Sequence, residues 1–256
     1  PLDLLEADWV RRAAELRQVI DKAQPAAALC DAGLLSELEL AATAAPGPMP
    51  ILAFNAADTP GSLEQRAAAA PDAFEACPTA ADDIALLAFT SGTTGAPKAV
   101  VHTHRDILAA CNAWPRHVLK ATPDDVVTGS PPLAFTFGLG GLLVFPMAAG
   151  SAIYFPDARY TPEGMVREMG AHGVTICYTS PTFYRQMAPH ARAIGIPGLR
   201  ICVSAGEALP DATRQLWKEA TGIEMLDGIG ATEMFHIFIS SAGGQVRRGA
   251  IGKAVP

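Results

Sequence analysis

Short apolar runs alternate with segments of helical periodicity along almost the whole chain, and this alternation is the feature that most constrains the fold. Runs such as IALLAF (84–89), VTICYTS (174–180) and LRICVSAG (199–206) have the length and β-branched content of buried strands. Strands that alternate with helices are typical of a parallel sheet whose two faces are covered by helices. The sequence therefore predicts an α/β fold with parallel-rich sheets.

The other expected elements follow from the same patterns. An opening helix carries Leu5, Trp9, Ala13, Leu16 and Ile20 at helical spacing. A further helix is expected over 106–119, with an interruption at Pro115. Residues 56–83 are rich in Ala, Pro, Asp and Gly and predict a long connection with one short helix at 63–69. Further strands are expected at 26–30, 51–55, 99–103, 126–130, 151–155, 223–228 and 234–241.

Composition excludes several classes of protein. The chain is 50% hydrophobic and only 18% charged, which is enough apolar sequence for a large buried core. The net charge of -7 argues against a nucleic-acid partner. The longest apolar run, 139–150, is too short to span a bilayer and contains Pro146, so no membrane association is expected.

The cysteines predict neither a disulfide framework nor a metal site. They are widely spaced, and none forms a C-x-x-C pair or a cluster with histidine: Cys30, Cys77, Cys111, Cys177 and Cys202. Buried, reduced thiols in a cytoplasmic protein are the favoured interpretation. Both ends of the chain, at Pro1 and Pro256, are expected to be cut ends.

A loop rich in hydroxyl groups follows the run at 84–89. Between Thr90 and Lys98 it supplies four hydroxyls, two glycines and one cation, which together suit a polyphosphate. An ordinary P-loop NTPase is disfavoured, because Pro97 and Ala99 stand where that motif needs a glycine and a hydroxyl. The remaining alternative is a surface turn with an incidental lysine.

The order T-S-G-T-T-G-x-P-K resembles the signature loop of the acyl-adenylate-forming ligases. In that family the loop holds the β- and γ-phosphates of ATP and the departing pyrophosphate. The family usually has a glycine where Ala99 stands. The resemblance implies that the nucleotide contacts here are Thr90, Ser91, Gly92, Thr93, Thr94, Gly95 and Lys98.

Two later segments resemble motifs of the same family, in the same order. GIGATE (228–233) is similar to the family's Y-G-x-T-E motif, which implies that Thr232 contacts the adenylate phosphate and that Glu233 binds Mg²⁺. Ile229 replaces the tyrosine often found there. With Lys98, these two residues make up the expected catalytic set.

SAGEALP (204–210) is similar to the segment that lines the adenine pocket after a strand end, where open α/β sheets place their ligands. Asp227 is expected to accept the adenine amino group. For Glu207 and Asp227 a helix-capping or turn role is about equally favoured. The expected wall comprises Gly206, Glu207, Ala208, Asp227, Gly228, Ile229 and Gly230. GAIGKAVP (249–256) resembles the family motif that follows.

Two segments, 133–141 and 233–238, are expected to line the pocket for the acid, and their aromatic character suits a flat aryl carboxylate. They closely resemble the benzoate-CoA and 2-aminobenzoate-CoA ligases. The residues placed against the ring are Thr136, Phe137, Gly138 and His236. Core packing is an equally favoured role for Phe137 and for His236.

Other polar residues near these segments receive weaker assignments. Tyr178, Thr179 and Pro181 close a strand aimed at the same region, and one of them is expected to touch substrate. His102 and His104 are expected to orient the phosphate loop rather than to act in catalysis. If 233–238 is a regular strand, Glu233 and His236 lie on opposite faces.

The resemblance covers 84–256 well and implies the following organisation. Residues 1–83 are a partial N-terminal subdomain and linker, 84–256 are the ATP- and acid-binding core of a large N-terminal domain, and the family's C-terminal domain is absent. The implied enzyme is an AMP-forming aryl-CoA ligase of aromatic-compound catabolism that uses ATP, Mg²⁺ and coenzyme A, and this piece is expected to be inactive alone. The open alternatives are a non-catalytic nucleotide-binding remnant and a domain that loads an aryl acid onto a carrier protein. A homodimer is left open.

Overall fold

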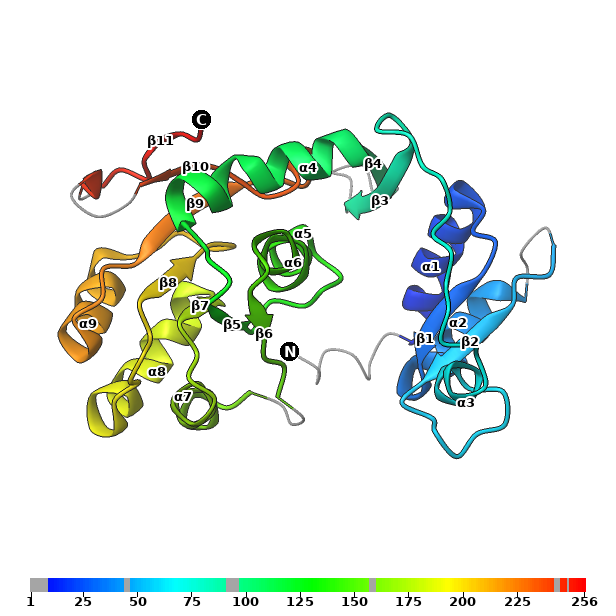
Figure 1. The fold of residues 1–256 in the computed structure, drawn as a ribbon, viewed down its shortest axis with the longest axis horizontal. Coiled ribbons are helices and arrows are strands. Elements are labelled where there is room, and N and C mark those ends of the chain that lie inside the picture. The colour runs from blue at the N-terminus through cyan, green and yellow to red at the C-terminus, as the bar shows by residue number, and fades with distance from the viewer. Residues whose placement is uncertain (1–8, 44–46, 91–96, 157–159, 242–244, 248) are drawn as a thin grey trace. The chain divides into compact units, whose positions relative to one another are not determined.

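The computed structural model describes residues 9–43, 47–90, 97–156, 160–241, 245–247 and 249–256 (Figure 1). The chain divides into two compact units. The first comprises residues 1–80 and 89–100, and the second comprises residues 81–88 and 101–256. The chain therefore passes between the units three times, and two of these crossings lie within strands β3 (Ile84–Thr90) and β4 (Lys98–Thr103), which pair with each other. The predicted division at residue 83 stays a prediction.

The first unit contains a small parallel sheet with helices around it. Strands β1 (Ala28–Asp31) and β2 (Ile51–Phe54) pair in parallel, in agreement with the strands expected there. Helix α1 (Trp9–Ala23) precedes β1, a 3₁₀ turn and α2 (Leu35–Ala42) follow it, and α3 (Leu63–Ala68) comes after β2. Ser62 caps α3 by accepting a hydrogen bond from the Gln65 amide, which explains why this helix begins where it does.

The second unit is built on a seven-stranded sheet of order β11-β10-β9-β8-β7-β5-β6. The parallel strands are β5 (Val126–Gly129), β6 (Ala152–Ile153), β7 (Ile176–Thr179), β8 (Ile201–Ser204) and β9 (Leu226–Gly230). Strands β10 (Ile237–Ser241) and β11 (Lys253–Ala254) extend the sheet in antiparallel fashion. The α/β class predicted from the sequence is confirmed.

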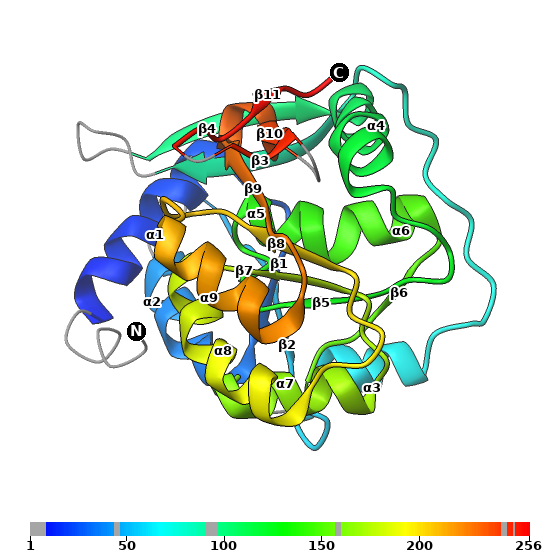
Figure 2. The same ribbon diagram turned by 90° about the vertical axis from the view of Figure 1, so that its left-hand side faces the viewer.

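Helices cover both faces of this sheet. Successive residues of a strand point to opposite faces, so each central strand contributes side chains to two cores. Helices α7 (Pro162–Ala171), α8 (Pro181–Ile194) and α9 (Asp211–Thr221) lie together beside the sheet (Figure 2). Cys177 and Cys202 face the core on this side, where Trp217 is fully buried. Tyr178 and Val203 face the other core. There they pack with residues of α4 (His104–Asn112), the π-helical turn Pro115–Leu119, α5 (Thr136–Leu139), the π-helical turn Gly140–Val144 and α6 (Phe145–Ala149).

The order of the parallel strands creates a topological switch point. Strand β5 pairs with β6 on one side and with β7 on the other, so the chain leaves β5 in one direction and then returns to its opposite edge. Ligands of open α/β sheets bind beyond the carboxyl ends of strands at such points. Ser130, just after β5, contacts Thr179 at the end of β7 through their hydroxyl groups.

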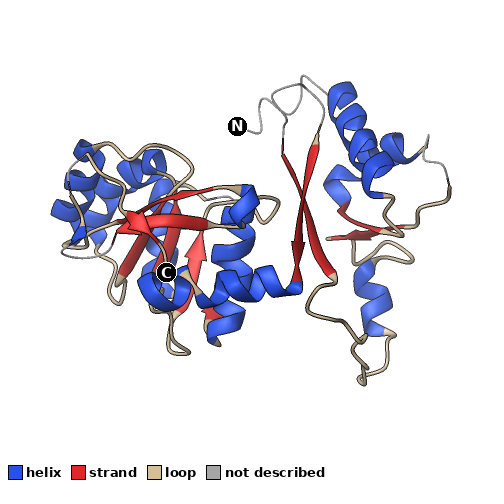
Figure 3. Cartoon of the chain, turned by 90° about the horizontal axis from the view of Figure 1, so that it is seen from above, coloured by secondary structure: helices blue, strands red, loops and turns tan. Residues whose placement is uncertain are grey.

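Several element boundaries differ from the sequence expectations. Figure 3 shows the helices, strands and loops of the described residues by colour. The helix expected over 106–119 begins at His104, where Thr103 and Asp106 form a capping box, and it ends at Asn112; a separate π-helical turn then begins at Pro115. The strand expected over 234–241 begins only at Ile237, since residues 232–234 form a 3₁₀ turn. Strand β11 was not expected. No helix among the described residues is long and apolar enough to cross a bilayer.

The cysteines differ in burial. Cys177 and Cys202 are buried, Cys30 and Cys111 are partly buried, and Cys77 is exposed, and all five are free. Burial raises the pKa of the Cys177 thiol to about 12, so this thiol stays protonated and unreactive at neutral pH. The expectation of buried thiols is confirmed for Cys177 and Cys202 and is wrong for Cys77, which is exposed.

Candidate functional site

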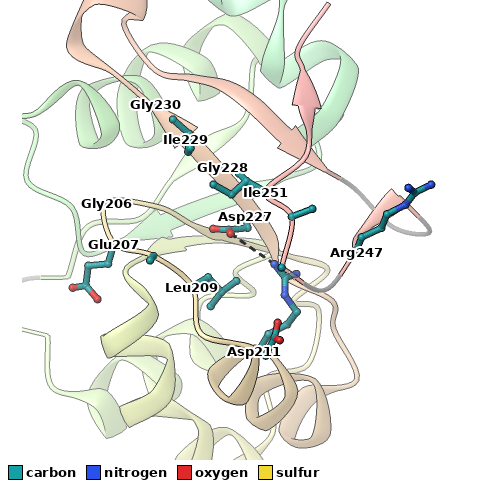
Figure 4. Close-up of a pocket in the computed structure, with 14 residues that line it drawn as sticks. Gly206, Glu207, Leu209, Asp211, Asp227, Gly228, Ile229, Gly230, Arg247 and Ile251 are labelled. Atoms are coloured by element: carbon teal, nitrogen blue, oxygen red, sulfur yellow. Dashed lines mark ion pairs between the residues drawn. The ribbon is translucent and has the colours of Figure 1, made fainter.

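A cavity of about 620 Å³ opens beyond the carboxyl ends of β8 and β9 (Figure 4). One wall is the loop between β8 and α9, in which Gly206 adopts a left-handed backbone with φ of +85°. The other wall is the end of β9. The structure thus brings together all seven residues expected to form the adenine wall: Gly206, Glu207, Ala208, Asp227, Gly228, Ile229 and Gly230.

Asp227 is the buried carboxylate of this cavity, with a relative exposure of 8%. Burial raises its pKa, while Arg214 of α9, whose Nη2 lies 3.8 Å from Oδ2, works in the opposite direction. Arg214 also binds Glu224 Oε1 at 3.0 Å and donates to the Met225 carbonyl, so its guanidinium is held in place. Arg214 was not predicted from the sequence, because nothing in the composition of α9 distinguishes an inward-facing arginine from a surface one.

Glu207 lies apart from Asp227 in this cavity (Figure 4). Its Oε2 accepts a hydrogen bond of 2.7 Å from the Thr182 hydroxyl near the start of α8. The side chain is exposed and the contact connects the β8–α9 loop with α8. The turn role considered for Glu207 therefore has a contact to support it, whereas Asp227 is the carboxylate held within the cavity.

The glycines of β9 are required by the neighbouring strand. A Cβ at Gly228 would lie 2.6 Å from the Ile237 side chain, and one at Gly230 would lie 2.9 Å from the His236 carbonyl oxygen. Real Cβ atoms do not approach this closely, so a side chain at either position would push β10 away from β9. These two glycines therefore serve the strand pairing as well as the cavity wall.

The phosphate loop is described only at its two ends. Thr90 is partly buried at the end of β3, and Lys98 is exposed at the start of β4; both belong to the first unit. The expected contacts Ser91, Gly92, Thr93, Thr94 and Gly95 lie outside the described residues. Lys22 of α1 donates a hydrogen bond of 3.2 Å to the Pro97 carbonyl, which brings a second cation to the loop. Because Lys22 lies 75 residues before Pro97 in the chain, no local sequence motif contains both residues.

Thr232 and Glu233 lie in the second unit, on the 3₁₀ turn between β9 and β10. Thr232 is partly buried and Glu233 is exposed. The turn ends at Phe235, a non-glycine residue with φ of +64°. Glu233 and His236 do not lie on a regular strand, so the condition for placing them on opposite faces is not met: residues 232–234 form the 3₁₀ turn, and β10 begins only at Ile237.

His102 of β4 holds this turn. Its Nε2 lies 2.7 Å from the Thr232 carbonyl oxygen, and its ring meets the Phe235 ring edge-on with a centroid distance of 5.7 Å. His104, in contrast, begins helix α4 and does not continue the strand. The expectation that both histidines orient the phosphate loop stays a prediction, because residues 91–96 lie outside the described residues.

His236 is enclosed by aromatic rings and has an exposure of only 3%. Its neighbours are Trp114, Phe137, Phe145 and Tyr178, with ring centroids 4.6–6.2 Å away. Burial lowers its pKa to about 3, so the ring is neutral at physiological pH, although the contact with the Phe137 carbonyl acts in the other direction. Nε2 lies 3.2 Å from that carbonyl oxygen, and Nδ1 is buried without a partner.

The other residues expected near the acid lie in or beside this aromatic cluster. Phe137 is partly buried against Tyr178 and His236. A Cβ at Gly138 would lie 2.1 Å from the Pro132 carbonyl oxygen, so this glycine is needed for α5 to pack on the preceding loop. Thr136 is partly buried at the start of α5. Tyr178 and Thr179 are fully buried, and Pro181 begins α8.

A second cavity, of about 480 Å³, lies between α4 and the 232–235 turn. Its inner wall carries Trp114, Phe145, Phe235 and His236, and α4 contributes small side chains. Glu233 lies at this cavity as well. The contribution of α4 to this cavity was not predicted from the sequence. The spacing of Ala109, Ala110 and Ala113 on one helical face is the signal that indicates it.

Comparisons with known proteins agree with the motifs. Residues 7–256 match the family described as AMP-binding enzyme. The benzoate–CoA ligase of Thauera aromatica is 40% identical over 197 residues, which are 76% of this chain and 37% of that enzyme. The p-hydroxybenzoic acid–AMP ligase FadD22 of Mycobacterium tuberculosis is 35% identical over 195 residues, 76% of this chain and 27% of that protein.

A solved structure of similar fold is the anthranilate CoA ligase AuaEII in complex with anthranoyl-AMP. It superposes with a TM-score of 0.85 at 33% identity, and the match covers 95% of this chain and 48% of that protein. The chain thus spans about half the length of this relative and less of the curated ones.

Proposed function

This chain belongs to the AMP-binding enzyme family, and we propose that it is part of an enzyme that activates an aromatic carboxylate, benzoate or 2-aminobenzoate, as an acyl-adenylate for transfer to coenzyme A. One observation carries the proposal. The two segments that resemble the family's adenine motifs, 204–210 and 228–233, are separate in sequence, yet residues of both line a single cavity beside the buried Asp227.

The chemistry proposed for the nucleotide follows from the motifs that this chain shares with the family. The carboxylate of the aryl acid attacks the α-phosphorus of ATP, the bond to the bridging oxygen breaks, and pyrophosphate leaves. Lys98 offsets the charge of the departing phosphates, while the Thr232 hydroxyl donates to the phosphate that becomes part of the adenylate. Asp227 accepts a hydrogen bond from the adenine amino group. The protein thus positions the reactants and stabilises charge, and it forms no covalent intermediate itself.

Glu233 offers Mg²⁺ a single carboxylate ligand. Among the described residues, no group of three or more His, Cys, Asp or Glu side chains is placed to hold a metal ion. A single exposed carboxylate suits Mg²⁺, because this ion keeps several waters and takes its other ligands from phosphate oxygens. Bound there, Mg²⁺ would offset the charge of the triphosphate.

The cavity between α4 and the 232–235 turn supports the choice of an aryl acid. Its inner wall is aromatic, the facing side chains on α4 are small, and its volume of about 480 Å³ suits a single ring. The relatives named above act on benzoate, p-hydroxybenzoate and anthranilate according to their names. We propose the same class of substrate here, with His236 in the wall of the cavity and Phe137 packed against the His236 ring.

A second acceptor deserves its own test, because one relative is named an AMP ligase rather than a CoA ligase. Such a protein would perform the same first half-reaction and then load a carrier protein. Consumption of free coenzyme A by the adenylate-forming protein supports the first proposal, and its absence in the presence of adenylate supports the second.

The assay for the first half-reaction is pyrophosphate exchange into ATP with benzoate or 2-aminobenzoate, on a version of the protein that continues beyond Pro256. Lys98→Ala is expected to weaken ATP binding about tenfold or more, because a cation that offsets phosphate charge is lost. Lys218→Ala, on the exposed side of α9, is the matched control and should stay within about twofold. Unchanged ATP affinity and exchange in Lys98→Ala would refute the role of this lysine.

A further inference from the structure

His102 makes a contact that the resemblance to the ligases does not account for. It lies on β4, and its side chain is buried, with a relative exposure of 4%. The Nε2 atom is 2.7 Å from the carbonyl oxygen of Thr232, 130 residues later in the chain. A carbonyl oxygen can only accept, so Nε2 must carry the hydrogen and donate it.

The turn that receives this hydrogen bond needs support. The Thr232 carbonyl also accepts the Phe235 amide at 3.0 Å, which closes the turn. Phe235 has φ of +64°, a conformation that costs a residue with a side chain free energy. The His102 ring packs edge-on against the Phe235 ring, so one side chain contacts both ends of the turn.

The backbone of His102 is itself well fixed. It lies in β4, which pairs with β3. The next residue, Thr103, is the N-cap of α4, and its capping box with Asp106 closes both reciprocal hydrogen bonds. A donor held by a strand on one side and by a capped helix on the other loses little freedom when it binds the turn.

We propose that His102 is a positioning residue for the adenylation step: its Nε2–H holds the Thr232 carbonyl, and thereby sets the direction of the Thr232 hydroxyl and the Glu233 carboxylate. This inference rests on the proposed function, since it assigns those two groups to phosphate and Mg²⁺. His102 does not touch the reacting atoms and transfers no proton. Its contribution is to keep the turn in one geometry before the nucleotide arrives.

Two substitutions separate the hydrogen bond from the ring. His102→Gln keeps an N–H donor near the position of Nε2, whereas His102→Phe keeps an aromatic ring and removes the donor. The same pair at His190, a partly buried histidine on α8, is the matched control. All variants are compared with the parent in a version of the protein that continues beyond Pro256.

His102→Phe is expected to lower the rate constant for pyrophosphate exchange about tenfold and to raise the Mg²⁺ concentration for half-maximal exchange severalfold. KM for the aryl acid should change less than about threefold. His102→Gln should recover most of the exchange rate and of the Mg²⁺ response. Equal losses in the two variants, or a greater loss in His102→Gln, would overturn the inference, because the donor would then not be what matters.

A measurement on the parent protein keeps the inference testable if His102→Phe does not fold. Nitrogen NMR of the imidazole should show hydrogen on Nε2 with slow exchange; an Nδ1–H tautomer would overturn the inference. If the parent shows exchange and His102→Phe shows the same exchange, the role of His102 is rejected and the proposed function is not. No exchange by the parent with any aryl acid rejects the proposed function, and the role of His102 with it.

Discussion

At the scale of single residues, His236 is the most unusual side chain of the candidate site. It is buried among four aromatic rings, its Nδ1 lacks a partner, and its pKa is lowered to about 3. A neutral imidazole is therefore part of the folded core, and a protonated one is incompatible with it. This makes the core of the second unit sensitive to acid at a single position.

The pH dependence of stability follows from that pKa. In the unfolded chain the histidine takes up a proton below its ordinary pKa of 6.5, whereas in the folded protein it does not until about 3. Stability contributed by the neutral ring is therefore present above pH 6.5 and is lost as the pH falls, by about 1.4 kcal/mol per pH unit within this window. Chemical unfolding at pH 7, 6, 5 and 4 measures the slope.

His236→Phe should make that slope shallower between pH 6 and pH 4, because it removes the titrating group and keeps an aromatic ring. His190→Phe on α8 is the matched control and should retain the slope of the parent. The same slope in His236→Phe as in the parent would contradict the assignment of the acid sensitivity to His236.

Gly138 illustrates a residue whose expected role and observed packing differ. The sequence analysis placed it against the substrate, and the structure leaves no room for a Cβ beside the Pro132 carbonyl. Gly138→Ala should lower the free energy of unfolding by about 1–3 kcal/mol, because backbone must move to admit the methyl group. Gly47→Ala, where a Cβ would meet nothing within 4 Å, is the control. Equal thermal stability of the two variants would contradict this packing role.

At the scale of elements, the starts of β5, β7 and β8 are tied together by one buried carboxylate. Asp125 accepts hydrogen bonds from Arg200 Nε and Nη2, from the Thr175 hydroxyl and from Thr122. Burial works to raise its pKa, but these hydrogen bonds outweigh it and hold the pKa well below the usual range. The network lies at the ends of the strands opposite to the candidate site, so it serves stability.

Removal of the arginine should therefore cost more than removal of an arginine from a surface pair. Arg200→Met leaves the Asp125 carboxylate buried and short of donors, and we expect a loss of about 1–3 kcal/mol in the free energy of unfolding at pH 7. Arg105→Met breaks an exposed pair with Asp82 and should cost less than about 1 kcal/mol. Denaturant unfolding measures the loss of unfolding free energy in both variants. Equal losses would contradict the stabilising role of the Asp125 network.

The elements themselves show what could be predicted from the sequence. The strand at 174–180 was visible because a buried strand reads as a continuous apolar run. The apolar run at 84–89 also forms a strand, but the burial expected for it is wrong, because β3 is exposed at Ile84 and only partly buried at its other end. The strand expected over 234–241 was predicted too long. Its β-branched and aromatic residues favour a strand throughout, whereas the 3₁₀ turn over 232–234 and the left-handed backbone of Phe235 delay the strand until Ile237. Strand β11 is two residues long and forms through pairing with β10, so local propensity carries no signal for it.

At the scale of the whole molecule, the candidate site divides into a part that motifs reveal and a part that they do not. That the segments 204–210 and 228–233 would line one cavity was predictable, because they follow or end neighbouring parallel strands whose carboxyl ends must meet at one edge of the sheet, while their role in binding adenine stays a prediction. The contacts of Lys22 with Pro97 and of His102 with Thr232 join residues 75 and 130 positions apart. Such contacts depend on the packing of distant elements, which no local pattern encodes.

The last prediction concerns the chain taken alone. It spans 48% of the solved anthranilate CoA ligase, and the resemblance to the ligase family implies that a C-terminal domain, which residues 1–256 do not include, supplies further charged groups to the site. Because the proposed reaction depends on positioned charges rather than on a covalent intermediate, losing one of them should lower the rate by orders of magnitude. Residues 1–256 alone should therefore show little or no pyrophosphate exchange with benzoate or 2-aminobenzoate, while a version that continues beyond Pro256 exchanges readily. Circular dichroism and thermal unfolding of both proteins provide the control for folding, and robust exchange by a folded 256-residue chain would show that its own residues suffice.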